Sequence, residues 1–137
     1  MILLKKEELR LEKKYLDKMI TAFEFLNVAD YMKKKSVKTN ANRLYFALET
    51  GCIAYLLFLG EKVPKNHSTI FKMIEKRDKN LKYNLEKLYD LRMQADYGNS
   101  SKFVELNEDV VVVYINIVST LLENIKRKMH IKGDVKW

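Results

Sequence analysis

The chain has 137 residues, of which 47% are hydrophobic and 32% are charged, and this balance fits one folded domain with its own core. Four glycines and a single proline are too few for a turn-rich β fold, whereas the abundant lysine, leucine and glutamate favour helices. The formal net charge of +8 favours contact with a polyanion such as nucleic acid, or with an acidic protein partner.

The composition also argues against several kinds of site. Cys52 is the single cysteine, so an internal disulfide and a multi-cysteine metal site are excluded, and its apolar neighbours predict an unreactive core thiol. The sequence has neither a glycine-rich phosphate loop nor an HExxH pattern, and we predict no metal and no cofactor. The longest apolar stretch, residues 54–60, is too short to cross a bilayer. We therefore expect a cytoplasmic protein that does not enter a membrane.

The first predicted helix covers residues 5–34. Its apolar residues form a narrow stripe with a helical period, which is typical of a helix that buries one face. The lysines at positions 33–35 suit its carboxyl end, where positive charge opposes the helix dipole. The stripe consists of Leu9, Leu16, Met19, Phe23 and Leu26.

A connector at residues 36–39 precedes a second helix, which we expect to be capped by Thr39 or Asn40 and to run to about residue 59. Apolar side chains occupy nearly every face of this segment, so it belongs in the middle of a bundle or beneath a partner. Gly51 lies at its centre, where glycine is about 1 kcal/mol less favourable than alanine. A close approach of another helix at Gly51 would explain this glycine.

Residues 60–66 form the clearest loop of the chain. A short helix follows with Ser68 as its predicted cap, and residues 77–80 interrupt the helical pattern. A fourth helix then carries an apolar stripe and ends at Gly98, after which residues 99–102 are polar. The stripe consists of Leu81, Leu85, Leu88, Leu91 and Ala95.

The last predicted helix begins near Asn107 and ends at about His130. Acidic residues in its first turn and basic residues at 126–128 both match the helix dipole. The valines at 110–113 are the one β-like run, but the apolar residues after them keep a helical period. Residues 131–137 are expected to be a frayed tail.

Short connections make neighbouring helices alternate in direction. The sequence therefore predicts one all-α domain over residues 1–137, with its core at about residues 5–130. The predicted architecture is an antiparallel up-and-down bundle of four or five helices.

The most informative stretch for function is residues 91–98, with the sequence LRMQADYG. Arg92 and Asp96 are four residues apart and share a helix face, Tyr97 follows them, and Gly98 closes the helix. Arginine presents a rigid fork of donors that suits phosphate, so these side chains are candidates for a nucleotide- or RNA-binding site. The same spacing is also typical of an exposed ion pair followed by a glycine cap, which needs no ligand.

Three further residues are candidates for binding a nucleotide or RNA. Asn42 and Arg43 precede Tyr45 near the start of the apolar second helix, and Arg43 is either the exposed edge of that helix or a second phosphate contact. His67 opens a helix after the proline loop, where it is a general base, a phosphate contact, or a capping or surface residue.

Three segments together resemble the HEPN superfamily, and more narrowly its small stand-alone archaeal and bacterial members. They are residues 41–47 (ANRLYFA), His67 after the proline loop, and residues 88–98 (LYDLRMQADYG), which agree with that family in order and spacing. The resemblance covers about residues 5–130. It implies a four- or five-helix up-and-down bundle, usually a homodimer, that often acts beside a minimal nucleotidyltransferase.

The resemblance also bears on catalysis. Several members are metal-independent ribonucleases of toxin–antitoxin or defence systems, in which an arginine and a histidine a few residues later face their counterparts across a dimer cleft. The arginine would neutralise charge as a ribose 2′-hydroxyl attacks the adjacent phosphate. This sequence keeps Arg92 but has Tyr97 where the histidine would stand. A phenol is a poor base at neutral pH, but it can bond to phosphate or stack on a base.

These observations leave three hypotheses, which we rank in the order given. The first is a binding module whose Arg92, Asp96 and Tyr97 bind a nucleotide, RNA or a nucleotidyltransferase partner. The second is a metal-independent endoribonuclease toxin, in which Arg92 stabilises the reacting phosphate and Tyr97 or His67 handles the proton. The third is a scaffold whose apolar second helix builds a dimer core, with Arg92 and Asp96 merely paired.

Overall fold

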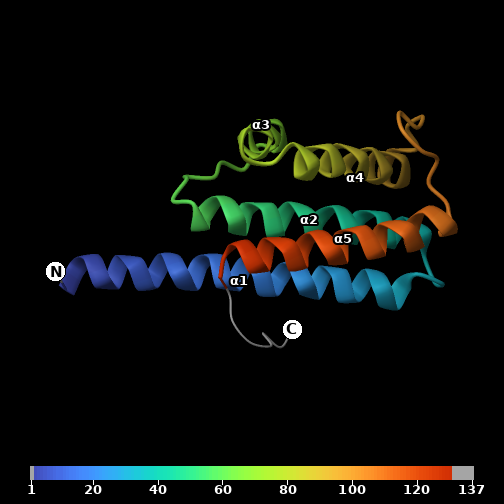
Figure 1. The fold of residues 1–137 in the computed structure, drawn as a ribbon. Helices are drawn as coiled ribbons and strands as arrows, with labels where there is room; N and C mark the ends of the chain where they lie inside the picture. Colours follow the sequence, from blue (N-terminus) through green and yellow to red (C-terminus); the bar gives the residue numbers. More distant parts are fainter. Residues whose placement is uncertain (1, 131–137) are drawn as a thin grey trace.

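The computed structural model describes residues 2–130, and the regular secondary structure in that range is entirely α-helical, which confirms the all-α part of the predicted fold class (Figure 1). None of the helices in this range is both long enough and apolar enough to span a bilayer. The predicted frayed tail, residues 131–137, lies outside the described residues. The helices are α1 (Ile2–Met32), α2 (Val37–Phe58), α3 (His67–Arg77), α4 (Lys79–Tyr97) and α5 (Glu108–Lys128).

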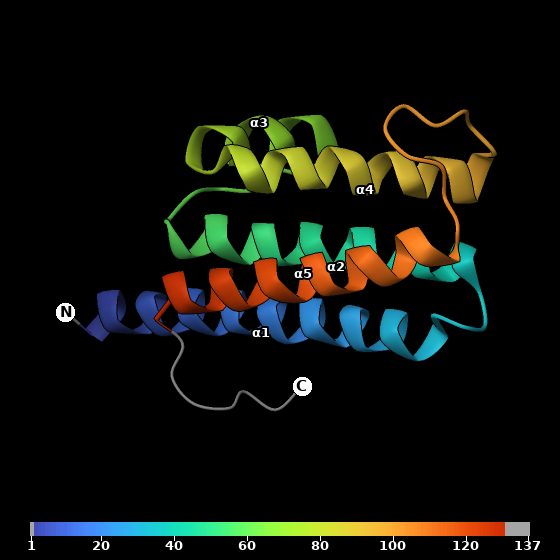
Figure 2. The ribbon, with the colours of Figure 1, turned by 45° about the vertical axis from the view of Figure 1, so that its right-hand side comes forward.

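Helix α2 lies at the centre of the molecule, as its apolar faces predict (Figures 1 and 2). α1 and α5 contact each other on one side of it, α3 and α4 contact each other on the other side, and all four helices contact α2. Tyr15 packs against Phe58 and Phe25 packs against Phe46, with ring centres 5.5 and 5.7 Å apart, so α1 and α2 run in opposite directions. The hydrophobic core therefore extends along both sides of α2.

Gly51 is a point of close approach between α2 and α5. A Cβ atom built on Gly51 would lie 2.4 Å from Cδ2 of Leu122 and 3.8 Å from Cβ of Ala22. Leu122 is fully buried, so its side chain has little room to move away from a Cβ atom at position 51. The predicted close helix approach at this glycine is confirmed.

Two predicted helix caps are wrong. Ser36 caps α2, because its Oγ accepts a hydrogen bond of 3.2 Å from the amide of Thr39; Asn40 lies inside the helix and is buried. Asn66, rather than Ser68, caps α3 by accepting from the amide of Thr69 over 3.2 Å. In both cases the capping side chain stands three residues before the amide that it satisfies, so each helix begins earlier than the apolar pattern indicates.

The ends of α4 and α5 agree more closely with the sequence. Gly98 closes α4 in the left-handed conformation with φ of 66°, which glycine adopts without strain. Asn107 caps α5 by accepting a 2.9 Å hydrogen bond from the amide of Val110. α5 ends at Lys128, two residues before the predicted end, and His130 has a positive φ of 55°.

Asp78 joins three helices at one end of the molecule. It follows the last residue of α3, caps α4 through the amide of Leu81 at 3.1 Å, and accepts a 2.9 Å hydrogen bond from Nζ of Lys128 at the end of α5. Burial raises the pKa of the Asp78 carboxyl, but hydrogen bonds from Lys128 and from backbone amides outweigh it, so the pKa lies below its ordinary value.

Replacing Asp78 with alanine is expected to lower the free energy of unfolding by about 1 to 2 kcal/mol at pH 7, because α4 loses its cap. A lowered pKa stabilises the folded protein above the unfolded-state value of about 4, and this contribution is lost as the pH falls through the folded-state pKa. The difference between the two proteins should therefore shrink in acid. Urea denaturation from pH 7 to pH 3 tests this, with exposed Asp17→Ala as control; a difference that stays constant with pH would contradict it.

Candidate functional site

Arg92 lies on the face of α4 that packs against α2. Its Nε donates a 3.2 Å hydrogen bond to Oδ2 of Asp96, which confirms the predicted pair. The guanidinium carbon also lies 4.7 Å from the centre of the Phe46 ring and 5.3 Å from that of Tyr45, and the side chain is only 18% exposed. The pair is therefore partly buried on an aromatic surface, where cation–π attraction holds the arginine in one orientation.

Asp96 connects this arginine to the start of α2. Its Oδ2 also accepts a 3.2 Å hydrogen bond from Nδ2 of Asn42, whose Oδ1 in turn accepts one of 3.2 Å from Nη1 of Arg43. The guanidinium carbon of Arg43 lies 5.8 Å from the ring centre of Phe25 on α1. The structure thus brings four of the predicted site residues into one continuous polar chain between α2 and α4.

A groove of about 610 Å³ opens beside this chain. Its lining includes two cations, Lys38 and Arg43, and one carboxylate, Asp96, which is already paired with Arg92. Tyr97 lies at its edge and is 69% exposed. Arg92 is not part of the groove lining, but it offsets the negative charge of Asp96, which is. The groove therefore has a positive local charge and an exposed aromatic ring, both of which suit a nucleotide chain.

His67, the first residue of α3, belongs to a second polar cluster that it forms with Tyr45 and Glu49 of α2. Its Nδ1 lies 2.5 Å from Oε2 of Glu49 and 2.9 Å from the hydroxyl of Tyr45, which itself donates to Glu49. Glu49 is buried, whereas the His67 side chain is 41% exposed. Because Nδ1 faces a carboxylate, that nitrogen carries a proton, and Nε2 is left to meet a ligand. One predicted role of His67, as the cap of α3, is wrong, because Asn66 caps this helix and His67 is its first residue.

Tyr45 and Tyr89 connect the two polar clusters. The Tyr45 ring contacts the Arg92 guanidinium, and its centre lies 5.7 Å from that of His67 and 5.5 Å from that of Tyr89. Burial, followed by the hydrogen bond and negative charge of Glu49, raises the pKa of the Tyr45 hydroxyl, so this group remains a proton donor. Arg92 and His67 are thus held by a common aromatic support.

Glu49 and Tyr89 are the site residues that the sequence analysis missed. Glu49 is a carboxylate inside an otherwise apolar helix, and burial of a charge requires a partner, so its position alone indicated a special role. Its distance of 18 residues from His67 gave no indication of which partner it has. Tyr89 has the helical spacing of an ordinary half-buried residue and carried no signal of its own.

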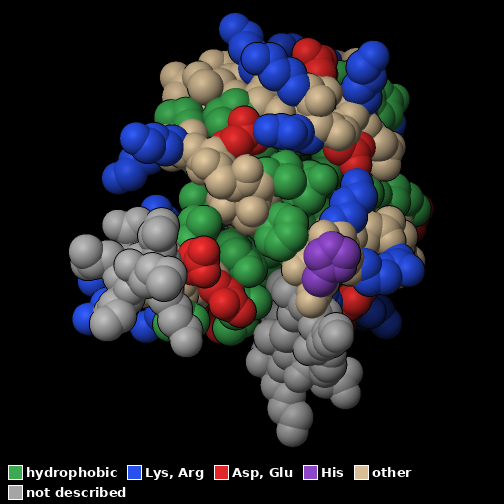
Figure 3. All heavy atoms as spheres, turned by 60° about the vertical axis from the view of Figure 1, so that its left-hand side comes forward, with side chains coloured by type: hydrophobic (Ala, Val, Ile, Leu, Met, Phe, Trp, Pro, Cys, Tyr) green, Lys and Arg blue, Asp and Glu red, His purple; other side chains and the backbone are tan. Residues whose placement is uncertain are grey.

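Positive charge is not confined to the groove. Figure 3 shows a different face, on which lysine and arginine side chains are spread around a hydrophobic area. Among the described residues, no group of three or more histidine, cysteine or acidic side chains is arranged to hold a metal ion. A test of the groove therefore needs a control in which a distant lysine is removed.

Comparison of the chain with protein-family models gives no match, and comparison with curated proteins gives none either. The structure alone shows the fold class, an all-α bundle. The resemblance to the HEPN superfamily remains a prediction made from residues 41–47, His67 and residues 88–98.

Proposed function

We propose that this protein is a binding module for nucleotides or single-stranded RNA. The observation that carries the proposal is the groove between α2 and α4, in which Lys38 and Arg43 face a carboxylate already neutralised by Arg92. Phosphate groups would bind to these two cations, and a base would stack on the exposed ring of Tyr97.

Binding to a labelled oligouridine RNA, followed by fluorescence anisotropy at 50 and 200 mM salt, tests the proposal. We expect Tyr97→Ala to weaken binding about tenfold through loss of stacking. Arg43→Ala should weaken binding and reduce its salt dependence by about one phosphate contact. Lys13→Ala is the matched control, because Lys13 is an exposed cation on α1 away from the groove. Absence of RNA binding, or equal losses in the control and in Arg43→Ala, would overturn the proposal.

The resemblance supports a finer form of this proposal. In that form the protein is an antiparallel, up-and-down HEPN-type bundle, acts as a homodimer, and works with a minimal nucleotidyltransferase in a cytoplasmic toxin–antitoxin-like system. The groove would then face its counterpart across the dimer. Sedimentation of the purified protein tests the dimer, and co-purification with the product of the adjacent gene tests the partner; a monomer at micromolar concentration would remove this finer form.

A second candidate function is a metal-independent endoribonuclease, and the Glu49–His67 pair favours it. Nε2 of His67 would take the proton of a ribose 2′-hydroxyl, and the 2′-oxygen would bond to the adjacent phosphorus. The bond to the 5′-oxygen would break, giving a cyclic phosphate and a 5′-hydroxyl whose proton comes from water. Arg92 would offset the developing charge. RNA cleavage in the presence of a metal chelator, lost in His67→Gln and in Arg92→Ala, is the expected result. Intact RNA after prolonged incubation would exclude it.

A further inference from the structure

The region around α3 carries a large share of the positive charge of the chain. Residues 61–82 contain seven lysine and arginine residues against three carboxylates, a surplus of four, which is half of the net charge of +8. Lysine and arginine side chains are prominent at the top of Figure 3, the level at which α3 lies. In Figures 1 and 2, α3 lies beside α4 at the outer edge of the molecule. The cations of this region are therefore concentrated around one outer helix.

The carboxylates of this region do not neutralise all of its cations. Each of the three already has a partner, in the ion pairs Glu61–Arg77 at 3.4 Å, Glu75–Lys82 at 3.0 Å and Asp78–Lys128 at 2.9 Å. Five exposed lysines remain, and none of them forms an ion pair with a residue that the structure describes. These five are Lys62, Lys65, Lys72, Lys76 and Lys79.

Four of these lysines follow α3 from its start to its end. Lys72 and Lys76 are four residues apart, so they share a face of the helix, about 6 Å apart along its axis. Lys65 directly precedes the cap of α3, and Lys79 directly follows its C-cap residue. We call these four residues the α3 lysine face. Their spacing allows neighbouring lysines to contact successive charges of an extended polyanion.

Lys79 stands where a lysine is unfavourable for folding. It is the first residue of α4, and the positive end of a helix dipole disfavours a cation at that position. The nearest carboxylate in sequence, Asp78, caps α4 and is paired with Lys128. A residue that opposes the local electrostatics of the fold is expected where function requires it, and here that function is contact with an anion.

The surroundings of the α3 lysine face favour phosphate over other anionic partners. Within the described chain, the exposed large hydrophobic side chains all lie outside residues 61–82. A membrane-surface helix needs apolar side chains that insert among lipids, and a protein interface needs aromatic or apolar anchors at its core, where lysine is depleted. Phosphate oxygens require only lysine ammonium groups and donors such as the exposed hydroxyl of Thr69.

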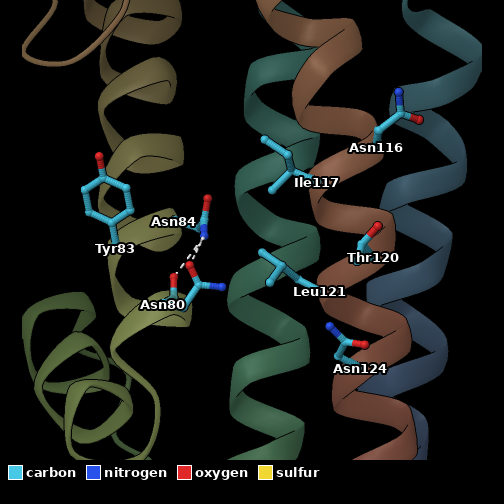
Figure 4. Close-up of a pocket in the computed structure, with 8 residues that line it drawn as sticks. All are labelled: Asn80, Tyr83, Asn84, Asn116, Ile117, Thr120, Leu121 and Asn124. Atoms are coloured by element: carbon cyan, nitrogen blue, oxygen red, sulfur yellow. Dashed lines mark hydrogen bonds between the residues drawn. The ribbon is translucent and has the colours of Figure 1, made fainter.

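The opening between α4 and α5, shown in Figure 4, provides a contrast. The described residues that line it are uncharged, and they combine amide side chains such as Asn80, Asn84 and Asn116 with Ile117 and Leu121 (Figure 4). This opening offers no cation to a phosphate group. The positive surface around α3 is therefore a local feature and does not continue into the neighbouring opening.

We propose that the α3 lysine face binds the phosphate backbone of a double-stranded nucleic acid, without preference for particular bases. Residues 61–82 have no exposed aromatic ring on which an unpaired base could stack. A duplex keeps its bases paired and presents one negative charge per about 1.7 Å of its axis, which suits a row of lysines. The inference does not depend on the proposed function, because the groove beside Tyr97 lies on other residues.

Fluorescence anisotropy with a short labelled DNA duplex, between about 50 and 200 mM salt, tests the proposal. The triple variant Lys72→Gln, Lys76→Gln, Lys79→Gln should weaken binding about tenfold at the lower salt concentration. The slope of log affinity against log salt concentration should fall by about 2 to 3, because each lost phosphate contact contributes about 0.9. A protein that does not bind the duplex, or an unchanged slope in the variant, would overturn the proposal.

A matched control removes the same charge elsewhere. Lys13→Gln, Lys14→Gln, Lys18→Gln replaces three exposed lysines of α1 and gives the same net charge as the first variant. Its affinity should stay within about twofold of the unmodified protein at about 0.15 M salt, where charges more than about 8 Å away are screened. Circular dichroism checks that both variants are folded. Equal losses of affinity in the two variants would show that net charge alone governs binding, which contradicts the proposal.

Other probes separate the duplex from other anions. Two DNA duplexes of unrelated sequence should bind equally, and a strong preference for one of them would contradict contact through phosphates alone. Polyglutamate of matched charge that bound as tightly as the duplex would show that any polyanion suffices. Phosphatidylserine vesicles that bound the protein and lost it in the first variant, with duplex binding unchanged, would assign the face to a membrane. Each of the last two results would overturn the proposal.

Tyr97→Ala separates this inference from the proposed function. The variant should bind the duplex as well as the unmodified protein does, because paired bases do not stack on Tyr97. Loss of duplex binding in Tyr97→Ala would assign the duplex to the groove and overturn the proposal for α3. Failure to bind oligouridine, with duplex binding intact and sensitive to the lysines of α3, would remove the groove and leave the α3 lysine face.

Discussion

Leu122→Ala is expected to lower the free energy of unfolding by about 2 to 5 kcal/mol, the range found when a fully buried leucine is truncated. Leu122 is completely buried on α5, and its Cδ2 atom occupies the space above Gly51. Loss of this side chain leaves a cavity at a close contact between α2 and α5. Urea denaturation followed by circular dichroism measures the effect.

A double-mutant cycle with Gly51→Ala shows whether the two positions are coupled. Alone, Gly51→Ala places a methyl group 2.4 Å from Leu122 Cδ2, and the resulting overpacking should exceed the gain of about 1 kcal/mol in helix propensity. In the Leu122→Ala protein the same methyl group fills the cavity and should be stabilising. Additive effects of the two substitutions would show that the close approach does not limit the packing.

Glu49→Leu is expected to lower the free energy of unfolding by about 3 kcal/mol, because the Tyr45 hydroxyl and His67 Nδ1 both lose a charged acceptor in a buried setting. Glu49→Gln should cost less, since an amide oxygen can still accept from Tyr45. Glu24→Leu, at an exposed position on α1, is the control and should change stability by about 0.5 kcal/mol or less. A Glu49→Leu protein as stable as the control would mean that the cluster contributes nothing to folding.

Glu49→Gln separates the two candidate functions, RNA binding and RNA cleavage. Glu49 lies outside the groove lining, so Glu49→Gln should leave RNA binding unchanged. Loss of the carboxylate would also remove the group that orients His67, so any RNA cleavage should fall sharply. Binding that weakens in parallel with cleavage would indicate that the two clusters act as one site.

The fold was largely predictable because its signals are local. The period of the apolar residues locates the five helices of residues 2–130, Gly98 marks the end of α4, and Gly51 marks a close helix contact. The caps at Ser36 and Asn66 were missed because the first turn of a helix has no apolar period of its own. A capping side chain must therefore be sought three residues before the first unpaired amide.

The site was only partly predictable, because its contacts join residues that are distant in sequence. The Arg92–Asp96 pair follows from spacing within one helix, and the structure confirms it. The contact of Asn42 with Asp96, 54 residues away, and that of His67 with Glu49 depend on how α2, α3 and α4 pack. The hydrogen bond from the amide of Lys102 to Oδ2 of Asp90 was not predictable either, because Lys102 lies in a segment without a helical or strand pattern.

The central position of α2 has a consequence for cooperativity. α1 with α5, and α3 with α4, form two helix pairs whose principal shared neighbour in the described chain is α2. Neither pair can retain most of its buried surface once α2 detaches. Fraying of α2 and global denaturation are therefore expected to be one event, so the protein should melt in a single calorimetric step rather than half at a time.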